Sequence, residues 1–304
     1  MNIFFLIYIK KNELYMKKLL NKINNIFLQF KSICRYFLHK NKNKVKISNE
    51  YQLVFEDNFE SDLTNWGKAQ NWGWFHPDYL HQYYGTGETF SYIKNGKLNL
   101  ETRYQPIHVI KSELPEWQQS EKLPDEFDLD YGVGLIHSKN SWQYGWFTAD
   151  IKLPVGKYLW PAFWLTGVNS WPPEIDIFEG YTLNDTNYLK KFLGFKLKWW
   201  KIQPNAHYGS VDDGSKKMWG AYDVPTYKST ENFIEYALHW EKDFIKIYYA
   251  GKLVMKITDP NVLTWFNGEK DQQQIILGNG TNFKNEKVDN SIMYVDNIKV
   301  YQKI

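Results

Sequence analysis

Hydrophobic and polar positions change their pattern near residue 50. After this point the chain consists of short alternating or apolar runs, which turn-forming residues separate from one another. The runs are QLVFEDNF, KNGKLNLET, GVGLIHS, YGWFTADIKLP, AFWLTG, PEIDIFEG, FIEYALHW, FIKIYYAGKLVMKI, QQIILGNG and IMYVDNIKVYQ. Asn95-Gly96 and Ala250-Gly251 fall between such runs, where tight hairpin turns belong. The pattern predicts many antiparallel strands and an all-β sandwich over residues 51–304.

Residues 1–50 follow a different pattern and are expected to be an N-terminal extension and linker. Residues 1–9 are apolar but lack the basic flank and the small-residue cleavage site of a signal peptide. Over residues 16–40, apolar side chains recur at helical spacing among Lys and Arg, which predicts a basic amphipathic helix. Such a helix would contact a membrane surface or a partner; the alternative is a poorly ordered leader before an internal start at Met16.

Charge supports a boundary at the same place. The 304 residues carry a formal net charge of +3, but residues 1–50 hold eleven Lys and Arg against two Glu, so the remainder is acidic. All 19 Gly, 11 Pro and 14 Trp lie after residue 50. The single Cys34 excludes an intramolecular disulfide framework, and the apolar runs are too short to span a bilayer. An acidic body without a recognisable binding motif argues against a nucleic-acid partner.

The stretch Trp171–Gly180, WPPEIDIFEG, holds three closely spaced acids. On a strand, Glu174 and Asp176 point to one face, because side chains alternate. Glu179 has the opposite parity, so an extra residue near Ile177–Phe178, a β-bulge, is needed to bring it to the same face. Three neighbouring carboxyls repel one another and raise at least one pKa, which suits acid–base chemistry. Spacing alone leaves open a solvated acidic strand face and a calcium site.

The residues around these acids resemble family 16 of the glycoside hydrolases, in its laminarinase-like group. YGWFTADIKLPVGKYLWPAFWL, followed by WPPEIDIFE, is similar to the catalytic region of that family. LVFEDNF, NGKLNLE, GVGLIHS, HYG, YALHWEKDFIKIYYAGKLV and MYVDNIKVYQ match further family segments in order, over about residues 53–302. The resemblance implies a β-jelly roll of two antiparallel sheets with a concave substrate cleft.

The resemblance also assigns roles to individual residues. It implies that Glu174 is the nucleophile, that Glu179 is the general acid and base, and that Asp176 tunes the pair. The residues that it places along the cleft as substrate-binding groups are Trp160, Trp164, Trp171 and His207. Aromatic residues make up 18% of the chain, and core packing is the alternative role for the tryptophans. For the histidine, the alternative is a structural hydrogen bond.

A structural cation is a further implication of the resemblance. Glu56, Gly96 and Asp296 occupy places comparable to those of the family's cation ligands, and an oxygen-rich set of this kind would suit calcium. Catalysis itself is expected to need no cofactor, because the carboxyls perform it.

The chain departs from the family pattern in places that affect substrate choice. The family usually has Glu and Arg within the segment 146–150, where this chain has Thr148 and Asp150. The loops expected at Gln105–Asp130 and Thr182–Ala206 are longer than the family minimum. Within the second, residues 189–201 read LKKFLGFKLKWWK; they would form either a basic aromatic wall that favours an acidic glycan or a hairpin whose lysines prevent edge pairing.

The sequence therefore predicts a retaining, endo-acting hydrolase of a β-linked polysaccharide. The substrate is expected to be a β-1,3-glucan of laminarin type or a β-galactan such as agar, porphyran or carrageenan. A carbohydrate-binding jelly roll without turnover is one alternative, and a transglycosylase that uses the same carboxyls is another. A polysaccharide substrate predicts an extracellular or surface-associated protein, and we expect a monomer.

Overall fold

The computed structural model describes most of the chain after residue 43. The described residues are 44–67, 75, 76, 78, 81–84, 89–185, 198–220, 223, 224, 226, 228–267, 272–281, 288 and 290–304, together with Met16 and Cys34. The helix predicted over residues 16–40 and most of the lysine-rich stretch 189–201 lie outside them. No helix in this described part is both long and apolar enough to cross a membrane.

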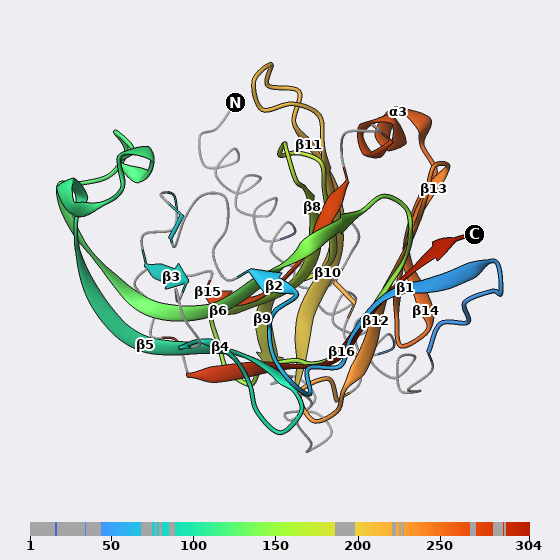
Figure 1. Cartoon of the computed structure of the whole chain (residues 1–304), viewed down its shortest axis with the longest axis horizontal. Helices are drawn as coiled ribbons and strands as arrows, with labels where there is room; N and C mark the ends of the chain where they lie inside the picture. Colours follow the sequence, from blue (N-terminus) through green and yellow to red (C-terminus); the bar gives the residue numbers. More distant parts are fainter. Residues whose placement is uncertain are drawn as a thin grey trace, which may run out of the picture.

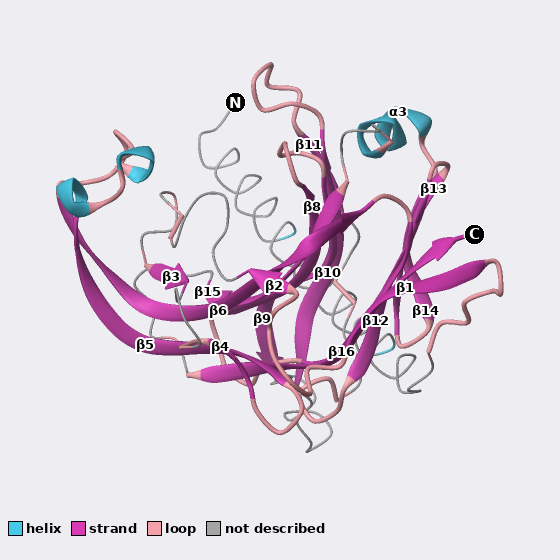
Figure 2. Ribbon diagram, viewed as in Figure 1, coloured by secondary structure: helices cyan, strands magenta, loops and turns pink. Residues whose placement is uncertain are grey.

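Strands make up nearly all of the regular structure, as the sequence predicts (Figure 2). They are β1 (Tyr51–Asp57), β2 (Trp66–Gly67), β3 (Gln82–Tyr84), β4 (Ser91–Ile93), β5 (Leu98–Ile110), β6 (Glu126–Trp142), β7 (Gly145–Lys152), β8 (Leu159–Gly167), β9 (Glu174–Asp185), β10 (Lys198–Tyr208), β11 (Lys217–Gly220), β12 (Ile234–Glu241), β13 (Phe244–Tyr249), β14 (Lys252–Ile257), β15 (Gln273–Thr281) and β16 (Ser291–Lys303). The short helices are η1 (Lys111–Glu113), η2 (Glu116–Gln118), α3 (Pro260–Leu263) and η3 (Thr264–Phe266).

The strands form two sheets that share β6 (Figure 1). One sheet, here called the cleft sheet, has the order β11-β10-β9-β8-β15-β6. The other, the outer sheet, continues from β6 through β5-β16-β7-β12-β13-β14. The long strand β6 pairs with β5 through its first half and with β15 through its second half. Almost all pairs are antiparallel, the pair of β3 with β6 being parallel.

The two predicted hairpin turns are present. Asn95 and Gly96 link β4 to β5 with φ of 56° and 63°, and Ala250 and Gly251 link β13 to β14 with φ of 50° and 72°. Positive φ at both central residues gives the turn a twist that matches the twist of the flanking strands. These short sequence signals therefore fix the register of two strand pairs.

The hydrophobic core lies between the two sheets. Alternate residues of the outer sheet point inward, so that Tyr236 of β12 packs its ring on Phe178 of β9, with 4.6 Å between centroids. Tyr249 of β13 is fully buried, and its Oη donates to the carbonyl oxygen of Ile177, 2.9 Å away. Packing of this density fixes the position of β9, the strand that carries the three acids.

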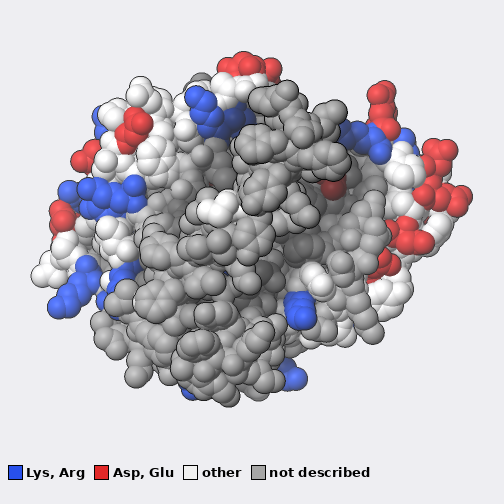
Figure 3. Space-filling view, turned by 180° about the vertical axis from the view of Figure 1, so that it is seen from behind, with Lys and Arg blue, Asp and Glu red and all other residues white. Residues whose placement is uncertain are grey.

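The segment Gln105–Asp130 is a long hairpin rather than a loop. Strand β5 continues to Ile110 and strand β6 begins at Glu126, because their apolar side chains pack in a second core cluster. The buried members of that cluster are Phe75, Tyr83, Phe90, Val109, Leu114, Leu123 and Leu129. The tip bears many exposed acids, and Asp and Glu gather at this edge in the view from behind (Figure 3).

Residues 44–50 cross the exterior of the outer sheet. Lys44 Nζ lies 2.6 Å from Asp150 Oδ2 of β7, and the backbone N–H of Val45 donates to Glu235 Oε1 of β12 at 2.6 Å. Asn297 of β16 also donates to Asp150, at 3.1 Å. Since the neighbours of these acids along each strand face the core, Asp150 and Glu235 point outward, away from the cleft sheet.

Candidate active site

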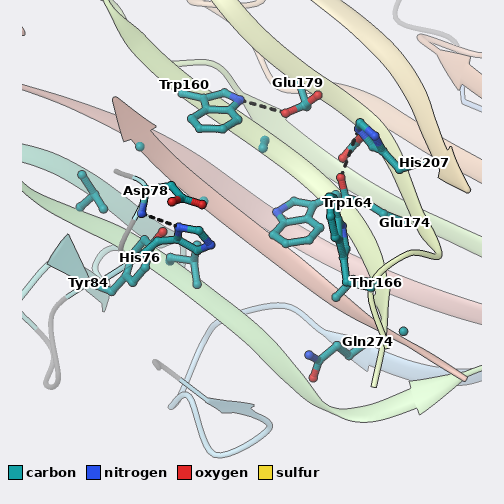
Figure 4. Close-up of a pocket in the computed structure, with 18 of the residues that line it drawn as sticks. His76, Asp78, Tyr84, Trp160, Trp164, Thr166, Glu174, Glu179, His207 and Gln274 are labelled. Carbon is teal, nitrogen blue, oxygen red and sulfur yellow. Dashed lines mark hydrogen bonds and ion pairs between the residues drawn. The ribbon is translucent and has the colours of Figure 1, made fainter. Parts of the chain in front are cut away.

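A cleft of about 830 Å³ crosses the exposed face of the cleft sheet (Figure 4). Its floor includes Ala162, Gly278 and Gly280, whose small side chains leave room above the strands. The polar and aromatic side chains that line it are His76, Asp78, Gln82, Tyr84, Trp160, Trp164, Thr166, Asn169, Ser170, Trp171, Glu174, Asp176, Glu179, Tyr181, His207, Lys216 and Gln274. Glu174, Asp176 and Glu179 of β9 therefore face one open site.

A β-bulge places them there. In the pairing of β9 with β8, Phe178 lies opposite Phe163 and Asp176 lies opposite Trp164, so Ile177 has no partner of its own. The pairing with β10 shows the same extra residue. Ile177 and Phe178 both point into the core, and Glu179 returns to the face of Glu174 and Asp176. The bulge predicted from the parity of the acids is confirmed.

Glu179 accepts hydrogen bonds from three side chains. Trp160 Nε1 donates to Oε1 at 3.1 Å, and Tyr181 Oη and Asn205 Nδ2 each donate to Oε2 at 2.8 Å. Burial raises the pKa of Glu179, and these three donors oppose the rise because they stabilise the charged form. Burial and hydrogen bonding thus act on the pKa of this carboxyl in opposite directions.

Glu174 and Asp176 form a tightly coupled pair. Trp171 Nε1 donates to Glu174 Oε2 at 2.7 Å, and Asp176 is hydrogen-bonded to Glu174. Burial and the charges of its neighbours raise the pKa of Asp176 well above its usual range, and its side chain is almost inaccessible. Burial also raises the pKa of Glu174, to about 8. Asp176 is therefore the member of the pair that stays protonated, and its O–H donates a hydrogen bond to Glu174.

His207 comes from the neighbouring strand β10, directly opposite Glu174 in the register. Its Nε2 lies 3.5 Å from Glu174 Oε1 and 3.5 Å from Asp176 Oδ2. Burial, and then the charge of Lys216, lower the pKa of His207 to about 4, so the ring is neutral at neutral pH. Glu174, Asp176 and His207 also have the donor types and the proximity, within 4.8 Å, to hold a metal ion.

The tryptophans expected along the cleft line it. Trp160 and Trp164 lie on one face of β8 and point into the cleft beside the acids (Figure 4). Trp171 precedes β9 at the cleft rim and is 45% exposed. Two of the three, Trp160 and Trp171, also donate hydrogen bonds to the carboxyls.

Among the residues of the site that were not predicted from the sequence, three contact the acids or their hydrogen-bond donors: Tyr181, Asn205 and Lys216. Tyr181 could have been predicted, because it lies two residues after Glu179 and so shares its face. Asn205 and Lys216 could not, because they belong to other strands and hairpins whose register is not readable from one sequence.

The residues of the expected cation site lie on the outer sheet, far along the chain from one another. Glu56 of β1 forms an ion pair with Lys299 at 2.9 Å, and Asp296 forms one with Lys97 at 2.7 Å. Gly96 is the turn residue next to Lys97. Both carboxylates thus already have a cationic partner, and the structural calcium stays a prediction.

An antiparallel two-sheet sandwich with three carboxyls and three tryptophans in an open cleft is the architecture of a carbohydrate-active jelly roll. The chain belongs to family 16 of the glycosyl hydrolases, whose family model matches residues 81–296.

Curated relatives support this family membership. The chain is 24% identical to "Glucan endo-1,3-beta-glucosidase A1" of Niallia circulans, over 83% of this chain and 38% of the relative. It is 28% identical to "Glucan endo-1,3-beta-glucosidase" of Cryptopygus antarcticus, over 53% of this chain and 54% of the relative. The chain thus spans about two-fifths to one half of the length of these relatives.

Solved structures share the fold. LamAcat from Zobellia galactanivorans superposes with a TM-score of 0.59 at 20% identity, covering 83% of this chain and 98% of that one. SCLam, a non-specific endo-beta-1,3(4)-glucanase, superposes with a TM-score of 0.60 at 23% identity, covering 88% of this chain and 97% of that one.

Proposed function

We propose that the protein is a retaining, endo-acting hydrolase of a β-linked polysaccharide and that residues 51–304 are its catalytic domain. The observation that carries the proposal is the bulge at Ile177, because it brings Glu179 into the same cleft as Glu174. A retaining glycosidase needs two carboxyls in one cleft, one ionised to attack and one protonated to assist departure. An open cleft also suits cleavage within a long chain, since the polymer can enter from the side.

In the first step, Glu179 gives its proton to the departing glycosidic oxygen while Glu174 attacks the anomeric carbon. The bond between the anomeric carbon and this oxygen breaks, and an ester bond to Glu174 forms. Trp171 and Asp176 hold the attacking carboxylate by hydrogen bonds, which fixes its orientation.

In the second step, ionised Glu179 removes a proton from water, and the water oxygen attacks the anomeric carbon. The ester bond breaks, and Glu174 leaves as a carboxylate. Trp160, Tyr181 and Asn205 stabilise the ionised form of Glu179 that this step requires. Asp176 stays protonated throughout, and its O–H donates a hydrogen bond to Glu174 whenever that carboxylate is free.

Of the substrates considered, a neutral β-1,3-glucan of laminarin type has the best support. Two of the curated relatives are named as endo-1,3-β-glucosidases. The β5–β6 hairpin packs against Phe75, whose neighbour His76 lines the cleft. The tip of this hairpin is acidic. Its negative field would repel sulfated galactans such as porphyran and carrageenan. Because such polymers do not enter cells, we further propose an extracellular or surface-associated protein.

The test separates the two carboxyls by chemical rescue. Glu174→Ala and Glu179→Ala should each lower the release of reducing ends from laminarin by at least about a thousandfold. With an aryl β-glucoside, whose phenolate departs without protonation, azide should restore turnover in both variants. The first should form an α-glycosyl azide and the second a β-glycosyl azide, because only the second still has its nucleophile. Glu235→Gln is the matched control, since it changes a half-buried carboxyl outside the cleft whose pKa is raised to about 7. Full activity in either Ala variant would refute the proposed roles.

A binding protein without turnover is the second candidate, because 28% identity relates 42% of the chain to "Beta-1,3-glucan-binding protein" of Penaeus monodon. The presence of both carboxyls with their hydrogen-bond donors favours the hydrolase. A transglycosylase would use the same pair with a sugar hydroxyl in place of water. Product analysis with laminarin distinguishes the three: no products, shorter chains, or chains longer than the substrate.

A further inference from the structure

The hairpin between β10 and β11 brings a lysine to the rim of the cleft. Gly209 begins the hairpin with φ of 90°, and a Cβ at this position would lie 2.4 Å from the carbonyl oxygen of Ser215. The backbone N–H of Ser210 donates to Ser215 Oγ, and that of Lys216 donates to the carbonyl oxygen of Ser210. These bonds fix the backbone that carries Lys216.

Lys216 is stacked on an indole that contacts a catalytic carboxyl. Its Nζ lies 4.0 Å from the ring centroid of Trp171, within the range of a cation–π interaction. The Nε1 of the same indole donates to Glu174 Oε2 at 2.7 Å. Among the described residues, no carboxylate oxygen lies within ion-pair distance of Lys216 Nζ. The aromatic ring is thus the partner that the structure gives this ammonium group.

A cation over an indole has two physical effects on the carboxylate beneath it. It draws electron density toward the ring face, which makes the Nε1–H a stronger hydrogen-bond donor. It also restrains the rotation of Trp171, which is 45% exposed and has its ring centroid 6.1 Å from that of His207. Both effects act on the oxygen of Glu174 that the indole contacts.

We propose that Lys216 is a positioning residue, which holds Trp171 in the orientation that donates to Glu174 and supplies a positive charge that acts on Glu174. This inference rests on the proposed hydrolysis and deepens it, because it adds a group that acts on the nucleophile through another side chain.

The charges around Glu174 support this role. The groups that face it are Asp176 and Glu179 on its own strand, His207 on β10, and Lys216 on the following hairpin. His207 is neutral at neutral pH, so Lys216 is the cation in this set. Lys216 lowers the pKa of Glu174 against the larger effects of burial and Glu179, which raise it.

An anion on the substrate is the competing partner for Lys216. The acids of β9 would repel a sulfate or carboxylate bound beside them, which favours the role toward Glu174. The two roles predict different effects of removing Lys216. Loss of a positioning residue lowers turnover of a neutral glucan, whereas loss of an anion-binding residue lowers turnover of charged glycans alone.

The kinetic test compares Lys216→Met with Lys216→Arg on laminarin across pH. Lys216→Met should move the acidic limb of kcat/KM to higher pH, so that activity falls about tenfold at pH 5 and less at pH 8. Lys216→Arg keeps the charge and should stay within about twofold of the wild type at every pH. Lys217→Met is the matched control, because Lys217 is the next residue along the chain and does not line the cleft. In the double variant of Trp171→Phe with Lys216→Met, the loss of kcat/KM should be smaller than the two single losses combined, because Lys216 acts through Trp171.

A spectroscopic test does not depend on turnover. The indole N–H resonance of Trp171, identified by its loss in Trp171→Phe, should move upfield in Lys216→Met and keep its position in Lys216→Arg. An unmoved resonance, or an unchanged pH profile in Lys216→Met, overturns the proposal. A loss confined to sulfated glycans assigns Lys216 to substrate binding instead and also overturns it. If the wild type cleaves no glycan, the proposed function fails. The indole N–H resonance would still show whether Lys216 acts on the hydrogen bond from Trp171 to Glu174.

Discussion

Glu179 shows how single side chains adjust a carboxyl that, in the mechanism we propose, both gives and takes a proton. Burial alone would keep it protonated, and Trp160, Tyr181 and Asn205 act against burial by donating to its two oxygens. Asp176, by contrast, is sealed beneath the cleft among other acids, and nothing opposes the rise of its pKa. The environments of the two side chains therefore separate their roles.

Tyr181→Phe tests this balance. Loss of the hydroxyl donor should raise the pKa of Glu179, because one bond to its charged form is gone. The basic limb of the kcat/KM profile on laminarin should move to higher pH, and the value at the optimum should fall about tenfold. Tyr92→Phe, which removes a tyrosine hydroxyl from Glu101 outside the cleft, should leave the profile unchanged. A profile identical to the wild type in Tyr181→Phe would mean that the donor does not act on the titrating group.

The bulge in β9 is the feature at the scale of elements on which the site depends. The sequence predicts it because three acids at positions 174, 176 and 179 share a face only with one extra residue between them. The strand pattern and the two hairpin turns are predictable for a related reason, since alternation and turn residues are local signals. The length of the β5–β6 hairpin was not predicted, because Ile107, Val109 and Leu129 extend the strands only through packing on Phe75 and its neighbours.

Deletion of Ile177 should convert β9 to a regular strand in which Glu174, Asp176 and Glu179 still share the cleft face, because the third acid then lies four positions after the first. We expect turnover on laminarin to persist and the melting temperature to fall, because the core packing of Ile177 is lost while the parity of the acids is kept. Ile177→Ala keeps the extra residue and loses only side-chain packing, at a cost of about 2–5 kcal/mol in the free energy of unfolding. It should retain kcat when assayed well below its melting temperature. Loss of kcat in the folded deletion variant but not in Ile177→Ala would contradict this expectation and show that the bulge does more than correct the parity of Glu179.

At the scale of the whole molecule, the buried carboxyls make stability depend on pH. Burial raises the pKa of Glu174 to about 8, that of Glu235 to about 7, and that of Asp176 well above its usual range. Groups whose pKa is raised by folding stabilise the folded state below their unfolded pKa, and this contribution is lost as pH rises through the folded value. His207 and His239 act in the opposite sense, since their pKa is lowered to about 4 and their contribution is lost below about pH 6.5.

Asp176→Asn should therefore reduce the alkaline loss of stability. Between pH 7 and pH 9, where the histidines stay neutral, the wild type should lose free energy of unfolding. The variant should lose about 1–3 kcal/mol less, because it has one fewer buried group to ionise. Urea unfolding at the two pH values measures the difference. A parallel decline in both proteins would indicate that Asp176 is already ionised in the folded state at pH 7, so that its pKa is not raised into this range.

The contacts of Lys44 and Val45 with the outer sheet determine how the cleft is presented. Asp150 and Glu235 hold this stretch on the side of the sandwich remote from the three acids. Whatever precedes Lys44 in the chain is therefore joined to the back of the enzyme. A tether to a surface, or an additional module attached there, would leave the mouth of the cleft directed outward, where a polymer strand can approach it from the surrounding medium.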